Sequence, residues 1–120
     1  MRADAMEEIL ADLNGSSGDI EASAVVSLDG LMMASLLPAN TEEDRVAAMS
    51  AALLALGERT ARELARGTLN QILIQGSEGY VIMTEAGSEA VLTVLTKKDA
   101  KLGLVFLDVS RAAKELGKLL

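Results

Sequence analysis

The sequence predicts an α/β (α+β) fold, a three-layer α/β/α sandwich with a five-stranded antiparallel sheet between the helices. Apolar residues recur with helical spacing in three segments, and the remaining apolar runs are short and bounded by Gly-containing turns. Several of these short runs are apolar at successive positions, which a strand needs when both faces of its sheet are covered. The expected order is α-β-β-α-β-β-β-α.

Composition narrows the class of protein. The 120-residue chain is expected to form a single domain over residues 1–120, with an aliphatic core because it contains one Phe, one Tyr and no Trp. A net charge of −7 argues against nucleic acid and anionic membrane partners. No apolar run approaches the ~20 residues that span a bilayer, the charged N-terminus lacks a signal-peptide core, and Cys is absent. We therefore expect a cytoplasmic protein without membrane insertion.

The first third of the chain predicts a helix followed by a hairpin. A short amphipathic stripe runs from Met6 to Leu13 and ends at Asn14-Gly15. Strands are expected over residues 20–27 and up to about residue 36, joined at Asp29-Gly30 by a two-residue turn in which both residues have positive φ. Neighbouring residues of a strand point to opposite faces, so Met32 and Met33 should enter different layers.

A long helix should follow, capped by Thr41 or Asn40, running to Arg66 and ending at a left-handed Gly67. Its helical periodicity places a mainly apolar group of seven residues on one side, which we expect to face the sheet. That group comprises Val46, Met49, Leu53, Leu56, Gly57, Thr60 and Leu64.

The middle of the opposite side of this helix consists of small residues, Ala48, Ala51, Ala52 and Ala55. Alanine is the best helix former, and this alone can explain the four residues. Alternatively, they form a flat patch that lets a second copy of the helix approach closely, because a two-fold interface needs only one self-complementary surface. We favour the second interpretation, which predicts a homodimer.

Three strands are expected next, at residues 68–75, 79–85 and 89–96, followed by a helix over residues 101–120. The first of these strands carries polar residues that are typical of a sheet edge, where they protect the edge or accompany pairing with another chain. We assign four of its residues to the predicted dimer interface, together with the four alanines: Asn70, Gln71, Leu73 and Gln75.

The sequence offers little catalytic chemistry. Without His or Cys it lacks the usual general base, the thiol nucleophile and the main zinc ligands. Gly117-Lys118 does not belong to a phosphate-binding loop, because Ala112 and Leu119 replace the required Gly and Ser or Thr. We therefore expect no enzyme activity, no cofactor and no metal site.

The stretches VVSLDGLMMAS, SAALLALGERTARELARG, LNQILIQGSEGYVIM and AVLTVLTKKDAKLGLVFLDV together resemble the Roadblock/dynein-light-chain family, most closely its bacterial and archaeal MglB-type members. The resemblance covers nearly the whole chain and is more specific for fold than for biochemical role. It implies a profilin-like or longin-like fold and a homodimer formed through the long helix and the third strand.

The resemblance also implies a partner, a small Ras-like GTPase held by the surface of the paired helices, whose GTP hydrolysis MglB-type members stimulate without donating an arginine finger. An alternative role is that of a structural adaptor or light-chain-like subunit in a signalling or motor assembly. The residues at matching places, which we predict to contact the partner, are Arg45, Glu58, Arg59, Arg62 and Arg66. A solvated face paired with nearby acids is the competing explanation for these arginines.

Overall fold

The computed structural model describes residues 2–120, and its elements follow the predicted order. The element bounds are α1 (Arg2–Gly15), β1 (Ile20–Ser27), β2 (Met32–Leu36), α2 (Glu43–Glu63), β3 (Ile72–Gly76), β4 (Gly79–Ala86), β5 (Ala90–Lys97) and α3 (Leu102–Gly117).

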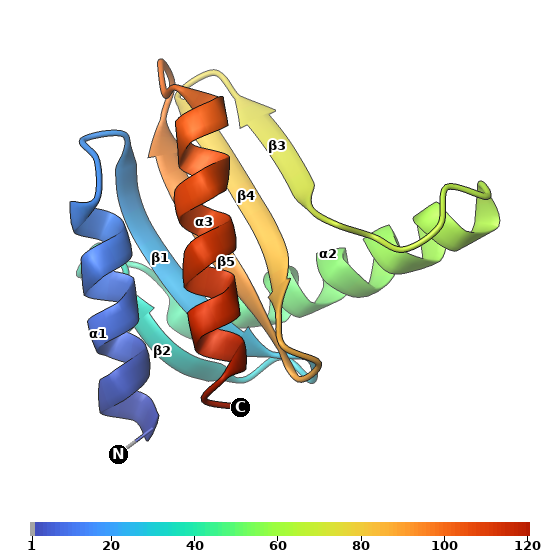
Figure 1. The fold of residues 1–120 in the computed structure, drawn as a ribbon, viewed down its shortest axis with the longest axis horizontal. Helices are drawn as coiled ribbons and strands as arrows, with labels where there is room; N and C mark the ends of the chain where they lie inside the picture. The colour runs from blue at the N-terminus through green and yellow to red at the C-terminus, as the bar shows by residue number, and fades with distance from the viewer. Residues whose placement is uncertain (1) are drawn as a thin grey trace.

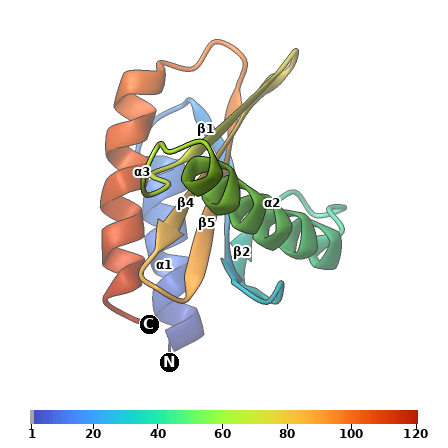
Figure 2. The ribbon, with the colours of Figure 1, turned by 90° about the vertical axis from the view of Figure 1, so that its right-hand side faces the viewer.

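The five strands form one antiparallel sheet in the spatial order β2-β1-β5-β4-β3. Figure 1 shows α1 and α3 in front of one face of this sheet, and Figure 2 shows α2 on the opposite face. The predicted three-layer α/β/α sandwich is therefore confirmed. The prediction that β3 is an edge strand is also confirmed, because within residues 2–120 β4 is its only neighbour in the sheet.

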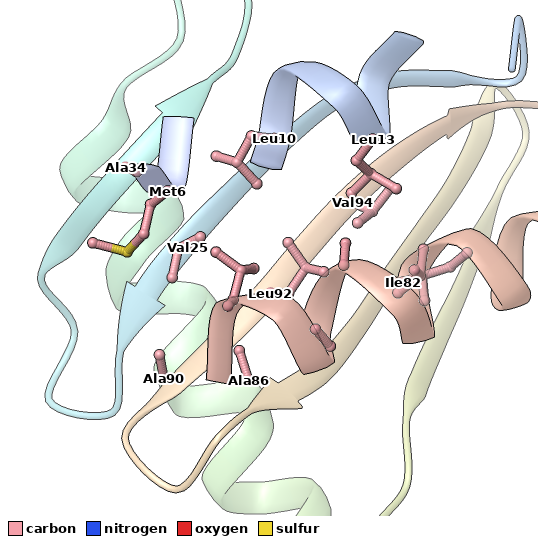
Figure 3. Close-up of a cluster of buried hydrophobic side chains, with 14 of the residues drawn as sticks. Met6, Leu10, Leu13, Val25, Ala34, Ile82, Ala86, Ala90, Leu92 and Val94 are labelled. Atoms are coloured by element: carbon pink, nitrogen blue, oxygen red, sulfur yellow. The ribbon is translucent and has the colours of Figure 1, made fainter. Parts of the chain in front are cut away.

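The larger of two apolar cores lies between the sheet and the α1/α3 layer (Figure 3). Met6, Leu10 and Leu13 of α1 face inward together because they lie three and four positions apart. The ambiguous run GLVFLDV is helical, as predicted from its spacing. The inward residues of α3 are Val105, Val109, Ala112, Ala113 and Leu116.

The smaller core lies between the sheet and α2, and its buried members are Val26, Ala47, Leu54, Met83 and Val91. The two methionines of β2 divide between the cores as predicted. Met32 packs against the α2 core, whereas Met33 packs against the α1/α3 core. Consecutive apolar residues in this strand thus reflect a sheet covered on both faces.

The β1–β2 turn differs from the two-residue turn predicted for Asp29-Gly30. The Ser27 N–H donates to the Leu31 carbonyl at 2.8 Å, and the Gly30 N–H donates to the Ser27 carbonyl at 3.0 Å. Gly30 has a φ of +91°, but Asp29 is not among the described residues with positive φ. The loop is therefore a turn followed by a left-handed glycine bulge. The Ser27 hydroxyl stabilises it by bonding to the Asp29 carboxylate and accepting the Leu31 N–H.

Both ends of α2 also differ from prediction. Glu42 occupies the N-cap position, without a side-chain cap hydrogen bond, so the prediction of Thr41 or Asn40 was wrong. At the other end the Arg66 N–H donates to the Ala61 carbonyl at 2.7 Å and the Ala65 N–H donates to the Arg62 carbonyl at 3.1 Å. This is a Schellman motif, and its left-handed residue is Ala65, with a φ of 58°. The helix thus ends before Arg66.

The strand predicted over residues 68–75 begins only at Ile72. The segment before it is held differently, because the Thr84 hydroxyl donates to the Asn70 carbonyl at 3.0 Å. The side chains of Leu69 and Ile72 instead approach α2 so closely that a Cβ on Gly57 would lie 2.8 Å from Ile72 Cδ1. The expectation that helices cover both faces of β3 was wrong, because Leu73 is 43% and Ile74 is 39% exposed.

Asp19 ties the start of β1 to the end of β5 and to α3. Its Oδ2 accepts the Lys101 backbone N–H at 2.9 Å, at the N-terminus of α3, and its Oδ1 lies 3.2 Å from Lys97 Nζ. The backbone hydrogen bond from Lys101 is the main cause that lowers the pKa of Asp19 below its ordinary value, with a further contribution from Lys97. The ionised carboxylate therefore favours the folded state.

Candidate functional site

The orientation of α2 about its own axis determines which residues are available for contacts. Ala47, Ser50 and Leu54 are buried against the sheet, and the Thr93 hydroxyl of β5 donates to Ser50 Oγ at 2.9 Å. Small residues on this side let the helix lie close to the strands. The inward face predicted for this helix is therefore only partly right. Leu53 packs against the α2 core, but Met49 is 52%, Leu56 61% and Leu64 64% exposed.

The apolar residues of α2 that do not face the sheet form an apolar surface together with the edge strand β3. We define the α2/β3 surface as Met49, Ala52, Leu53, Leu56 and Leu64 of the α2 region with Ile74 of β3. Figure 1 shows that the C-terminal part of α2 extends beyond the β3 edge of the sheet. An apolar surface of this kind is typical of a protein contact.

A cavity of about 230 Å³ opens between α2 and the sheet at this surface. Its wall is almost wholly apolar, and Ser50, Thr41 and Thr93 provide its hydroxyl groups. Met49 and Leu53 border it from the helix, and Ile74, Val81, Met83 and Leu95 border it from the strands. The cavity suits an apolar side chain of another protein better than a charged group.

The structure brings only part of the predicted alanine patch to the exposed apolar surface. Ala48, Ala52 and Ala55 are exposed, whereas Ala51 is half-buried beside the β1–β2 turn. A Cβ on Gly30 would lie 3.8 Å from Ala48 Cα and 4.0 Å from Ala51 Cβ, so the turn covers this end of the patch. The proposed role of the alanines remains a prediction.

The predicted interface residues of the third strand are all exposed, but they do not share one face. Asn70 and Gln71 precede β3, and Leu73 and Gln75 lie within it. Leu73 pairs with Ile82, which belongs to the α1/α3 core, so Leu73 points away from α2. A β3 edge that meets another strand through its backbone can accommodate side chains on both faces.

The five residues predicted to contact a partner are divided between the two ends of α2. Arg45 lies in the first turns and pairs with Glu42 at 3.1 Å. Arg59 pairs with Glu63 at 3.0 Å near the other end, so most of the 21-residue helix separates it from Arg45. Both ion pairs are exposed and contribute little to stability.

The other three residues gather at the C-terminal end of α2. Glu58 and Arg62 border a pocket with Gly67, and Arg66 Nε donates to the Leu64 carbonyl at 3.1 Å. Glu58 also lies near Glu85 at the end of β4. The pKa of Glu85 is raised, mainly by burial and in addition by the charge of Glu58. Within a single chain, Arg45 is therefore too far from Glu58, Arg59, Arg62 and Arg66 to contribute to the same small contact surface.

Sequence reasoning missed Met49, Leu56, Leu64 and Ile74 as exposed residues because it treated them as core. One signal could have found them. The inward residues Ala47, Ser50 and Leu54 have a helical spacing of their own, with Ala61 a further two turns along. A helix with two apolar sides offers one to its own sheet and the other to a second protein.

Among residues 2–120 there is no cluster of three or more His, Cys, Asp or Glu side chains that could hold a metal ion. The same part of the chain contains no helix with the length and apolar character needed to cross a membrane. Fold and surface together define a small α/β/α domain that presents a long helix beside an open sheet edge.

The chain belongs to the Roadblock/LC7 domain family, which matches residues 6–96. It is 40% identical over 111 residues to the uncharacterized protein MJ1340 of Methanocaldococcus jannaschii, covering 92% of this chain and 96% of that protein. A structure described as MglB with tetrameric arrangement is similar with a TM-score of 0.88 at 23% identity, over 98% of this chain and 89% of that one. The gliding protein MglB of Thermus thermophilus gives a TM-score of 0.87 at 22% identity, over 98% and 90%. The predicted family and fold are thus confirmed.

Proposed function

We propose that the protein is a non-enzymatic homodimer that binds a small Ras-like GTPase as a regulator or scaffold. The observation that carries the proposal is the α2/β3 surface, in which Met49, Leu56 and Leu64 are exposed in the isolated chain. Membership of the Roadblock/LC7 family supports it, since that resemblance implies both the dimer and the GTPase.

Two features favour pairing through α2 and β3. The open edge of β3 has backbone groups that a second β3 can pair with antiparallel, extending the sheet into the partner. The C-terminal part of α2 already projects past this edge (Figure 1). In such a dimer it would lie over the partner's sheet, where Leu56 could enter the apolar cavity.

The dimer is tested by replacing Leu56, which is 61% exposed, with Arg. Leu31→Arg is the matched control, because Leu31 is 65% exposed but lies at the β1–β2 turn. We expect sedimentation analysis to show that Leu56→Arg shifts the protein from dimer to monomer, because a charge would be buried. Leu31→Arg should remain dimeric, and a wild-type protein that is monomeric at micromolar concentration would contradict the dimer.

We assign the GTPase to the outer side of the paired helices, where arginines border the apolar surface. Arg59 and Arg62 are both exposed near the end of α2. Arginine is a favoured interface residue, and charges at the border of an interface mainly steer association. Reversing Arg59 and Arg62 to Glu should therefore slow GTPase binding without changing the dimer, and added salt should reduce the difference.

The binding experiment uses purified small Ras-like GTPases loaded with either GDP or a non-hydrolysable GTP analogue, followed by GTP turnover. Preference for the GTP state and faster turnover would support an MglB-like regulator. Binding without nucleotide preference or rate change would favour the structural adaptor instead. Absence of binding to every GTPase tested would contradict the proposed partner and leave the dimer to stand on its own test.

A further inference from the structure

The arginines of the α2 region form two separate groups within one chain. Arg45 lies in the first turns of the helix, whereas Arg59, Arg62 and Arg66 lie at its end or just beyond it. Arg45 and Arg59 are about 21 Å apart along the helix axis, at 1.5 Å per residue. A partner that contacts one group of a single chain therefore does not reach the other group through the same small surface.

Pairing of two β3 edges determines the relative direction of the two α2 helices. The two-fold axis between the paired strands runs perpendicular to the sheet, because α2 of both copies must stay on the same face. In one chain this is the face opposite α1 and α3 (Figure 2). Rotation by 180° about that axis reverses the direction of α2. The first turns of each α2 therefore lie toward the last turns of the other.

The apolar contacts determine how far the two helices overlap. The cavity that we assign to Leu56 of the other copy is bordered by Val46 and Met49. Arg45 directly precedes Val46, and Arg59 follows Leu56 by almost one helical turn. Because the helices are antiparallel, a contact between Leu56 and this cavity brings Arg45 of one copy close to Arg59 of the other.

We infer that each GTPase contact surface is completed across the dimer, where Arg45 of one copy joins Arg59, Arg62 and Arg66 of the other. The inference rests on the proposed dimer and GTPase partner, and it specifies how two chains share the residues of one site. Two such surfaces form, one toward each end of the paired helices, because a two-fold axis repeats every contact.

The four arginines of one such surface are available to an acidic partner. Arg62 and Arg66 have no carboxylate oxygen within 4.0 Å in the described part of the chain. Arg45 and Arg59 each pair with a glutamate of their own chain, but both pairs are exposed and contribute little to stability. These glutamates reduce the repulsion among the arginines, and the guanidinium groups can bind acidic side chains of a GTPase in a bidentate manner.

The test uses two variants, Arg45→Glu and the double reversal of Arg59 and Arg62 to Glu. In the pure dimer of either variant both surfaces carry one part of the damage, and GTPase binding should weaken about tenfold. A mixed dimer that combines one chain of each variant has one intact surface, because all the reversals meet at the other. Its binding should return to within about twofold of wild type, since one of two equivalent surfaces remains.

The matched control is a mixed dimer with the same three reversals in one chain and none in the other. Both of its surfaces are damaged when Arg45 acts across the dimer, so binding should stay about tenfold weaker than wild type. Mixed dimers are purified through a different affinity tag on each chain. Arg111→Glu makes the same charge reversal on α3, across the sheet from α2, and should leave binding unchanged.

A second measurement tests the arrangement without a GTPase. The chain contains no Cys, so Arg45→Cys in one copy and Arg59→Cys in the other introduce the only thiols. A bismaleimide with a reach well below 21 Å, about the separation of these positions within one helix, should join the two copies. Two copies of Arg45→Cys should not link, because their thiols lie toward opposite ends of the paired helices.

The outcomes separate this inference from the proposed function. If wild-type protein binds none of the GTPases tested, the proposed partner is contradicted and this inference fails with it. If wild type binds a GTPase but the first mixed dimer stays as weak as the pure variants, the inference alone is overturned. Absence of the Arg45–Arg59 cross-link in a protein that sediments as a dimer would also overturn it, and leave the GTPase proposal to its own binding test.

Discussion

Leu54 and Leu56 lie two positions apart on α2, yet they should respond oppositely to truncation. Leu54 is 1% exposed and belongs to a core of five buried residues, whereas Leu56 is 61% exposed. Removing a buried leucine side chain costs about 2–5 kcal/mol, since apolar burial is lost and a cavity remains. Removing an exposed one costs about 0.5 kcal/mol or less in the isolated chain.

These free energies convert into melting temperatures through the size of the chain. An unfolding entropy of about 2.1 cal/mol/K per residue gives about 0.25 kcal/mol/K for 120 residues. A loss of about 3 kcal/mol in Leu54→Ala should then lower Tm by about 12 °C, and Leu56→Ala should lower it by about 2 °C or less. The loss of about 3 kcal/mol in Leu54→Ala is a large share of the ~5–15 kcal/mol free energy of unfolding of an ordinary domain.

The assay is thermal unfolding followed by circular dichroism over a series of protein concentrations. The shift for Leu54→Ala should not depend on concentration, because its contacts lie within one chain. The shift for Leu56→Ala should grow with concentration, because the dimer stabilises only the wild type. At the lowest concentration, a larger Tm loss in Leu56→Ala than in Leu54→Ala would refute the orientation of α2 and favour the face that periodicity alone predicts.

Further predictions concern backbone strain and ionisation. Gly30→Val should lower Tm by about 4 °C or more, since φ is +91° there and a side chain costs roughly 1 kcal/mol or more; an unaltered Tm would contradict the turn. Ala65→Gly should raise Tm by up to about 4 °C by relieving the left-handed C′ position of α2, and a fall would contradict that cap. Asp19 has a lowered pKa, so its stabilisation is complete above the pKa of the unfolded chain and is lost as pH falls through the folded pKa. Asp19→Asn should therefore be less stable than wild type at neutral pH and converge with it in acid, as urea titrations across pH can check. Glu85 has a raised pKa, so the folded state loses stability as pH rises through it. Glu85→Gln should be more stable at neutral pH, with no gain in acid, and a gain that persists in acid would exclude ionisation as its cause.

The sequence by itself determined the element order and the covering of the sheet. Periodicity assigned all three helices, and the Gly-containing turns separated the strands, because both signals depend on residues close together in the chain. Consecutive apolar residues such as Met32 and Met33 showed that both sheet faces are covered. The polar residues before and within β3 indicated a sheet edge, which the strand order confirms.

Only the tertiary structure decided which side of α2 faces inward. Periodicity tells which residues share a side of a helix, but it cannot choose between two apolar sides, and the larger residues were the natural choice for a core. The sheet instead receives Ala47, Ser50 and Leu54, because small residues allow close approach and Ser50 finds a buried partner in Thr93. Tertiary contacts also set the late start of β3, whose preceding segment is held against Gly57 of α2. Local residue spacing cannot predict the orientation of α2 or the start of β3, since each depends on the shape of a surface formed by residues far apart in the chain.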